Sequence, residues 1–213
     1  MGTPHRVISG ADSTFMKKLR AITPLTSVIL LVLAVAAQTA QSGSFAHALQ
    51  LQLDPGKTSA DIVLTGNFHT VEGSFALKRG SIQYDPATGK TSGEIVFDAT
   101  SGKTGSDGRD RKMHKEVIES ARFPEISFRP DRAEGPLAAS GDSTVQVHGT
   151  FSIHGVDHEI TIPVTVHLEA QGWSAKAAFQ VPYAKWGMKN PSVLFLRVAS
   201  SVDIQFHAAG KIR

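Results

Sequence analysis

Cysteine is absent from all 213 residues of the chain. Its absence excludes a disulfide-linked scaffold, a cysteine nucleophile, a thiolate metal site and a lipid-modified N-terminal cysteine. A protein without disulfides depends on its apolar core for stability. The segment 49–213, about 165 residues long, is sufficient for a core, since a domain of this size buries roughly 70% of its unfolded surface.

Residues 49–213 also carry no net formal charge. The formal net charge of +3 comes entirely from residues 1–48, where four basic side chains stand against Asp12. Of the 22 basic and 19 acidic residues, the segment 49–213 therefore keeps 18 of each sign. This neutral balance argues against a nucleic-acid partner, because nucleic-acid-binding domains are typically basic.

Long apolar runs are confined to the first 48 residues. The run "LTSVILLVLAVAA" (25–37) follows the positively charged segment 16–20, and Ala46 and Ala48 are small residues at the positions that a signal peptidase reads. The pattern predicts a secretory signal peptide over residues 1–48, with Met16 as an alternative start. The run is shorter than the roughly 20 residues that span a bilayer, although an uncleaved anchor is the alternative. We therefore expect a periplasmic or secreted protein with no membrane span after cleavage.

Helical periodicity is rare in residues 49–213, which we expect to form one domain. Alternation of apolar and polar residues is frequent instead, as in "STVQVHGTFSI" (143–153) and "EITIPVTVHL" (159–168). The same signal predicts strands within 49–54, 60–65, 71–78, 81–85, 93–99, 172–181 and 201–208, separated by turns such as Asp85-Pro86-Ala87-Thr88-Gly89.

One stretch has a helical pattern. Residues 107–124, "DGRDRKMHKEVIESARFP", place Met113, Val117 and Ala121 at helical spacing, with Asp107 as a candidate cap and Pro124 at the end. The fold class predicted from these elements is all-β with one inserted helix, either an antiparallel barrel of about eight strands or a sandwich.

Several segments together are similar to one known family. The sequence resembles the YceI-like family of exported polyisoprenoid-binding proteins in two long segments. They are "VEGSF…GSIQYDPATGKTSGEIVFDATSGKTGSDGRDRKMHKEVIESARFPEISF" and the later "VHGTFSIHGVDHEITIPV". The resemblance covers about residues 49–209. Its most specific parts are Arg109-Asp110 opening the helix, Phe123-Pro124-Glu125-Ile126 after it, and Ile153-His154-Gly155-Val156 in a hairpin.

The resemblance implies a lipocalin-like antiparallel β-barrel whose elongated apolar cavity binds an isoprenoid-type lipid, often in a periplasmic homodimer. The sequence departs from the family pattern at residues 183–188, "YAKWGM", and in the following "KNPSVLFL". These departures affect the expected cavity shape and ligand, and not the fold. The loop 182–191 either exposes Tyr183 and Trp186 for function or closes one end of the barrel with them.

Four histidines lie within residues 148–167: His148, His154, His158 and His167. If the two strands here pair with their apolar faces matched, His148 lies opposite Thr165 and becomes a diagonal neighbour of His167. Each of the four is then expected on the polar face or in the turn. We predict no metal site and no cofactor.

The segment 107–116 is basic at its start. Arg109, Arg111 and Lys112 lie in the first turn of the predicted helix, where cations are unfavourable against the helix dipole. One interpretation is a site for an anionic lipid headgroup. The alternative, which the residues favour, is that Arg109 pairs with carboxylates at the barrel rim while Asp110 holds the start of the helix.

The candidate lipid-binding residues are apolar side chains on the predicted inward faces, and each is also a candidate for an ordinary filled core. They are Ile62, Leu64, Phe75, Phe97, Met113, Val117, Phe151, Ile162, Phe179 and Leu196.

We expect a non-catalytic protein that sequesters or carries a long-chain amphiphile. No nucleophile elbow is present, although Asp110 and His114 lie four residues apart on the predicted helix and leave a hydrolase as a further hypothesis. The alternative to a carrier is a barrel with a filled interior that acts as an interaction or stress-response module.

Overall fold

The computed structural model describes residues 48–213, and the predicted signal peptide lies almost wholly outside them. No helix in the described part is long and apolar enough to cross a membrane. The strands are β1 (Leu49–Leu53), β2 (Ser59–Thr65), β3 (Thr70–Tyr84), β4 (Thr91–Asp98), β5 (Glu125–Glu134), β6 (Gly141–Ile153), β7 (Val156–Leu168), β8 (Gly172–Val181) and β9 (Val202–Ile212).

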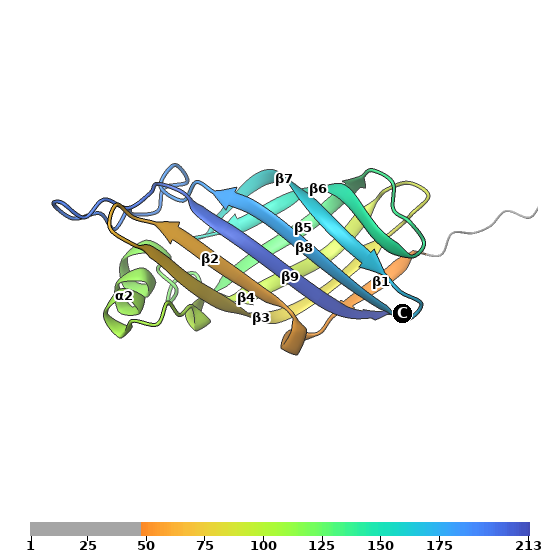
Figure 1. The fold of residues 1–213 in the computed structure, drawn as a ribbon, viewed down its shortest axis with the longest axis horizontal. Coiled ribbons are helices and arrows are strands. Elements are labelled where there is room, and N and C mark those ends of the chain that lie inside the picture. The colour runs from red at the N-terminus through yellow and green to blue at the C-terminus, as the bar shows by residue number, and fades with distance from the viewer. Residues whose placement is uncertain (1–47) are drawn as a thin grey trace, which may run out of the picture. The chain divides into compact units, whose positions relative to one another are not determined.

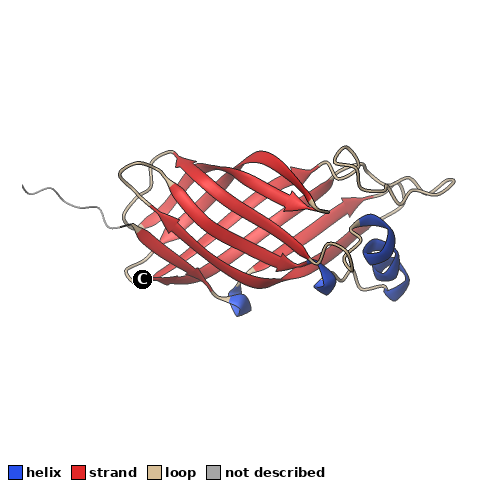
Figure 2. Ribbon diagram, turned by 180° about the vertical axis from the view of Figure 1, so that it is seen from behind, coloured by secondary structure: helices blue, strands red, loops and turns tan. Residues whose placement is uncertain are grey.

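The strands form one closed antiparallel ring (Figure 1, Figure 2). The order runs from β2 through β9, β8, β7, β6, β5 and β4 to β3, and β3 closes the ring by pairing with β2. The short β1 pairs with β3 and β9, the same two strands that flank β2, so β1 and β2 occupy one position in the ring. The predicted barrel of about eight strands is thereby confirmed.

A short 3-10 turn, η1 (Pro55–Lys57), interrupts this shared position. Asp54 caps the turn by accepting a hydrogen bond from the Gly56 amide at 2.9 Å, and Pro55 is well suited to the first position of the turn.

The predicted strands 71–78 and 81–85 are one continuous strand, β3, with a bulge between Leu77 and Arg79. A bulge adds twist, which helps a long strand curve around a barrel.

The β6–β7 hairpin has a different register from the predicted one. Ile153 pairs with Val156 across a two-residue turn of His154 (φ 54°) and Gly155 (φ 73°). Positive φ at both turn residues is the type I′ geometry that fits the strand twist. His148 consequently pairs with Thr161 and not with Thr165.

The inserted helix is shorter than predicted. A regular helix, α2 (Asp107–Lys112), continues into one π-helical turn, η3 (Met113–Val117), and the chain then leaves the helix at Glu119 with φ 46°. Ser106 holds the cap position predicted for Asp107. A second 3-10 turn, η2 (Ala99–Ser101), connects β4 to this region. In Figures 1 and 2, α2 lies at one end of the barrel.

Candidate lipid-binding cavity

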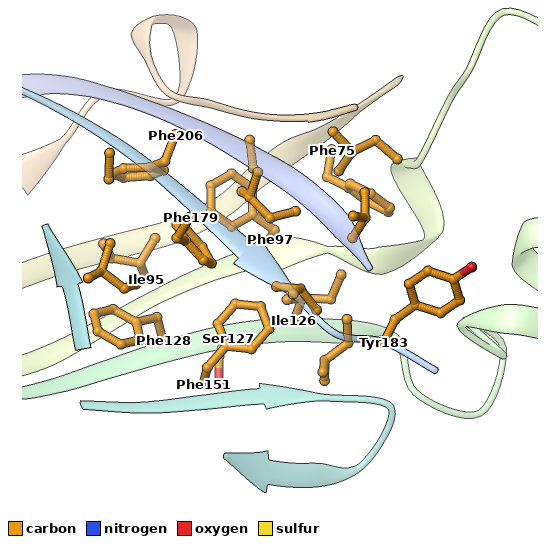
Figure 3. A pocket seen from close by; sticks show the side chains of 18 of the residues that line it. Phe75, Ile95, Phe97, Ile126, Ser127, Phe128, Phe151, Phe179, Tyr183 and Phe206 are labelled. Carbon is orange, nitrogen blue, oxygen red and sulfur yellow. The ribbon is translucent and has the colours of Figure 1, made fainter. Parts of the chain in front are cut away.

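The interior of the barrel contains a cavity of about 610 Å³. Side chains from every strand position of the ring line it, and Figure 3 shows aromatic and aliphatic groups converging on the empty space. Ser127, which is buried on β5, is a rare polar group among them. A volume of this size falls within the usual range for small-molecule sites, about 300–1,000 Å³.

Many inward-facing apolar residues are only partly buried. Ile62, Leu64 and Phe206 lie on the inner face of the barrel, yet each keeps an intermediate exposure. In a filled barrel, side chains from the opposite wall would bury such residues completely. Their residual exposure is to the cavity, so the interior is hollow.

We place the mouth of the cavity at the end of the barrel that carries α2, because the exposed lining residues lie there. His69, in the β2–β3 turn, and Gly108, on α2, are the two exposed residues among those that line it. The lining residues at the other end, which include Leu49, Tyr84 and Leu137, are buried or half-buried.

All ten predicted lipid-binding residues line this cavity: Ile62, Leu64, Phe75, Phe97, Met113, Val117, Phe151, Ile162, Phe179 and Leu196. Figure 3 labels four of them, Phe75, Phe97, Phe151 and Phe179. The structure brings them together, and lipid binding by them stays a prediction.

The three predicted headgroup cations are not equivalent. Arg109 and Lys112 line the cavity near its mouth. Arg111 does not, because residues three apart share a helix face while the residue between them points elsewhere, and it lines a shallow depression with His114 and Ser120 instead. The structure therefore does not bring Arg111 together with Arg109 and Lys112 at the cavity, and a headgroup contact of any of the three stays a prediction.

Arg109 is held by Thr104 and not by a rim carboxylate. Its Nε donates to Thr104 Oγ1 at 2.7 Å, and its terminal NH2 donates to the Thr104 carbonyl at 2.6 Å. Asp110 accepts a hydrogen bond from the Thr104 amide at 2.9 Å. The hydrogen bond from the Thr104 hydroxyl is the main cause that lowers the pKa of Asp110. Lys112 Nζ donates to the Pro191 carbonyl at 3.2 Å.

The segment 182–201 supplies lining residues that the sequence patterns did not identify. Tyr183 and Met188 are buried, and the Tyr183 hydroxyl donates to the Ala199 carbonyl at 2.6 Å. Burial raises the pKa of Tyr183. Of the two interpretations of this loop, the burial of Tyr183 favours packing against one end of the barrel over exposure for function. The two flanking prolines were the only signal, and they mark a loop without showing where it packs.

The predicted neighbours His148 and His167 lie apart along the hairpin. His148 Nδ1 lies 2.8 Å from Asp131 Oδ1 and its Nε2 lies 3.3 Å from Glu159 Oε2. His167 has its own carboxylates, Asp142 and Glu169. The predicted diagonal pair is wrong because the turn is shorter than assumed. Asp131, His148 and Glu159 cluster closely, and each ring nitrogen of His148 faces a different carboxylate.

His158 is the histidine that departs most from expectation. The observed register pairs it with Phe151, whose side chain points inward, so His158 also points inward and not to the polar face. Its ring stacks on Trp186 with centroids 3.9 Å apart and an interplanar angle of 6°. Its Nε2 is buried without a hydrogen-bond partner in the described part of the chain, and burial lowers its pKa.

Asp110 and His114, which suggested a hydrolase, line one shallow depression with Ser120, but their hydrogen bonds go to other partners. His114 Nε2 lies 2.8 Å from the Gly102 carbonyl oxygen, so it carries the proton, and Nδ1 accepts from the Ser120 hydroxyl at 2.9 Å. Asp110 is hydrogen-bonded to Thr104 and not to this imidazole. His114 therefore ties the π-helical turn to the segments on either side of it.

Comparisons with known proteins agree with this architecture. The model of the YceI-like domain matches residues 51–209. The chain belongs to the YceI-like domain family. The resemblance inferred from the sequence is thereby confirmed. A comparison with curated proteins returned no match.

Solved structures share the YceI-like fold at low sequence identity. BcnA of Burkholderia cenocepacia has a TM-score of 0.61 and 22% identity, over 74% of this chain and 99% of that one. A polyisoprenoid binding domain from Saccharophagus degradans, implicated in plant cell wall breakdown, has a TM-score of 0.60 and 19% identity, over 76% and 98%. The YCEI protein of Campylobacter jejuni has a TM-score of 0.54 and 15% identity, over 66% and 84%. The TM-scores show a common fold, and at these identities they show the fold alone.

Proposed function

We propose that this YceI-like protein binds an isoprenoid-type or other long-chain amphiphilic lipid, with the apolar tail inside the barrel, and sequesters or carries it. The observation that carries the proposal is the hollow, almost wholly apolar interior of about 610 Å³. Burying a tail there gains roughly 25 cal/mol per Å² of apolar surface removed from water. No catalytic group is needed for this function.

The polar end of the lipid would lie at the mouth. Arg109 and Lys112 are positioned there, and both retain partial exposure. Arg109 is already oriented by Thr104, which leaves less side-chain freedom to lose when an anionic headgroup binds. A phosphorylated or carboxylated head fits these two cations better than a neutral head does.

Membership of the YceI-like family and the predicted export signal support a lipid-binding protein outside the cytoplasm. A structural neighbour is described as a polyisoprenoid binding domain, which agrees with a lipid ligand but does not establish one at 19% identity. The predicted signal peptide supports a periplasmic or secreted location. A homodimer remains a prediction from the family resemblance.

Organic extraction of the purified protein tests the proposal. We expect mass spectrometry to find one long-chain lipid per barrel. Ala177 lines the cavity, so Ala177→Phe should fill part of it and lower the lipid content severalfold, whereas Ala178→Phe, on the exposed face of the same strand, should leave it unchanged.

Protein that contains no lipid and takes up none when offered prenyl phosphates in detergent would contradict the proposal. Equal lipid content in both variants would place the lipid outside the cavity. In either case the alternative of an interaction module without a small ligand would gain support, although the hollow interior already contradicts its filled-barrel form.

A further inference from the structure

The exposed apolar side chains of the protein are gathered at one end. In the described residues, the large exposed hydrophobics are Phe68, Val156, Val193, Leu194 and Phe195. The pairings of β2 with β3, of β6 with β7 and of β8 with β9 place the turns that carry them at the same end of the barrel as α2. In Figure 1 the 182–201 loop, drawn in blue, projects at this end. This is also the end where the cavity has its mouth.

Three of these residues form a fixed apex, which we call the apolar tip: Phe68, Leu194 and Phe195. Their exposed fractions are 74%, 91% and 85%, so they contribute almost nothing to the core. Leu194 and Phe195 stand at the apex of a tight turn, closed by hydrogen bonds between Val193 and Leu196 at 2.8 and 3.1 Å.

Asn67 holds the two parts of the tip together. Its side-chain amide donates to the Phe195 carbonyl at 3.0 Å, and its Oδ1 accepts from the Arg197 amide at 3.1 Å. The Asn67 amide itself donates to the Arg197 carbonyl at 3.1 Å. The apolar tip is therefore presented as one preorganised surface that spans two loops, and not as two independent ones.

The chain segment that carries Leu194 and Phe195 is basic, although one of its cations, Lys189, pairs with Glu116. Residues 182–201 contain Lys185, Lys189 and Arg197 and no acidic residue, although residues 49–213 as a whole are neutral. Arg109 and Lys112 lie at the neighbouring mouth. Exposed Leu and Phe bordered by cations are the chemistry that enters the interface of an anionic bilayer, where basic side chains meet lipid phosphates.

We propose that the apolar tip inserts into the surface of an anionic lipid bilayer and brings the cavity mouth against it. The proposal extends the lipid-binding function, because a long-chain lipid could then pass between bilayer and cavity without crossing water. Leu196 and Val198 follow the tip closely in the chain and line the cavity, so the tip lies beside the cavity lining.

Vesicle flotation tests this docking. Protein purified from an exporting host, with its N-terminus determined by intact mass, is mixed with vesicles of phosphatidylcholine alone or with equal parts of phosphatidylglycerol. We expect binding to the anionic vesicles, and at least about tenfold weaker binding for Leu194→Glu/Phe195→Glu, which removes two apolar anchors and adds like charge. The matched control, Ala138→Glu/Ala139→Glu, adds the same charges at the opposite end and should bind like the parent.

A second experiment removes cations near the tip. Lys185→Gln/Arg197→Gln should weaken binding to the anionic vesicles several-fold and leave the weak binding to phosphatidylcholine unchanged, whereas Lys211→Gln, at the far end of β9, should change neither.

Three results would overturn the proposal: a parent protein that binds neither vesicle, a tip variant that binds as the far-end control does, or a tip variant that turns a dimer into a monomer without changing vesicle binding. The last result would assign the tip to a contact between copies. Failure of the lipid-binding function would appear separately, as an inability of the parent to take up lipid from detergent micelles, which needs no vesicle.

Discussion

His158 illustrates how one residue acquires its role from its neighbours. Its imidazole is stacked between the barrel wall and Trp186, with Nε2 buried and unpaired in the described part of the chain. Burial disfavours the charged imidazolium and lowers the pKa of His158, while the nearby Asp157 carboxylate opposes this in part. The stack joins β7 to the 182–201 loop, which also supplies Tyr183.

We predict that His158 makes folding sensitive to mild acid. Because the pKa of His158 is lower in the folded state than the roughly 6.5 of an unfolded chain, the unfolded state binds the proton more readily below that value. The free energy of unfolding should therefore fall as pH drops from about 7 toward 5, and part of this fall should disappear in His158→Phe.

Urea denaturation at several pH values measures the effect. His207→Phe, at an exposed outer position of β9, removes a histidine without touching the stack and should keep the parent's pH dependence. If the two variants lose stability with acid to the same extent, the buried imidazole is not the source.

Arg109 and Arg111 also differ in their surroundings, although they are two residues apart in the chain. Both are headgroup candidates from their positions in a basic segment, although the sequence favours an ion pair for Arg109. The structure brings Arg109 and Lys112 to the cavity mouth and turns Arg111 away, because the helix separates neighbours by about 100°. Sequence proximity could not distinguish them until the start of the helix was known.

Among the elements, the shared position of β1 and β2 is where the ring is most tightly closed. The last residues of β1 pair with β9, where Leu53 lies opposite Gly210. A Cβ atom at Gly210 would lie 1.8 Å from the Gln52 carbonyl oxygen, a distance that only backbone movement could relieve. Glycine at this position therefore permits the contact between β1 and β9.

Gly210→Ala should destabilise the protein by about 3 kcal/mol or more, since the clash is with backbone and cannot be relieved by a rotamer change. Gly172 lies on the adjacent strand, where an added Cβ would meet nothing closer than 3.7 Å. Gly172→Ala should therefore change stability by no more than about 0.5 kcal/mol. Unfolding midpoints in urea compare the two, and similar midpoints would show that β1 can shift to accommodate the methyl group.

At the scale of the whole molecule, a hollow barrel has less internal packing than a filled one. Two separate clusters of buried side chains surround the cavity, one that includes Leu53 and Trp173 and one that includes Phe151 and Tyr183. A ligand that fills the space between them supplies the missing dispersion contacts. On the proposed function, a bound lipid would therefore stabilise the folded barrel.

Removal of the lipid should lower the thermal midpoint. A ligand present at about a hundredfold excess over its Kd adds about 2.7 kcal/mol to the free energy of unfolding. Scanning calorimetry of the protein before and after extraction, and again after reloading with a prenyl phosphate, measures the change. Ala177→Phe, with part of the cavity filled, should show a smaller difference between the two states. An unchanged midpoint would mean that no ligand occupies the folded barrel.

Alternation of apolar and polar residues predicted every described strand except β5 (Glu125–Glu134), and the ten residues predicted to bind lipid all line the cavity. A period of two residues assigns Phe151 and Ile162 to one face whatever strand lies beside them. Register, loop packing and volume depended on longer-range contacts. The positive φ angles of His154 and Gly155 set the hairpin register and turned His158 inward. The volume of the interior was decided by the closed barrel, because alternation specifies which side chains face inward but not how far apart the opposite walls stand.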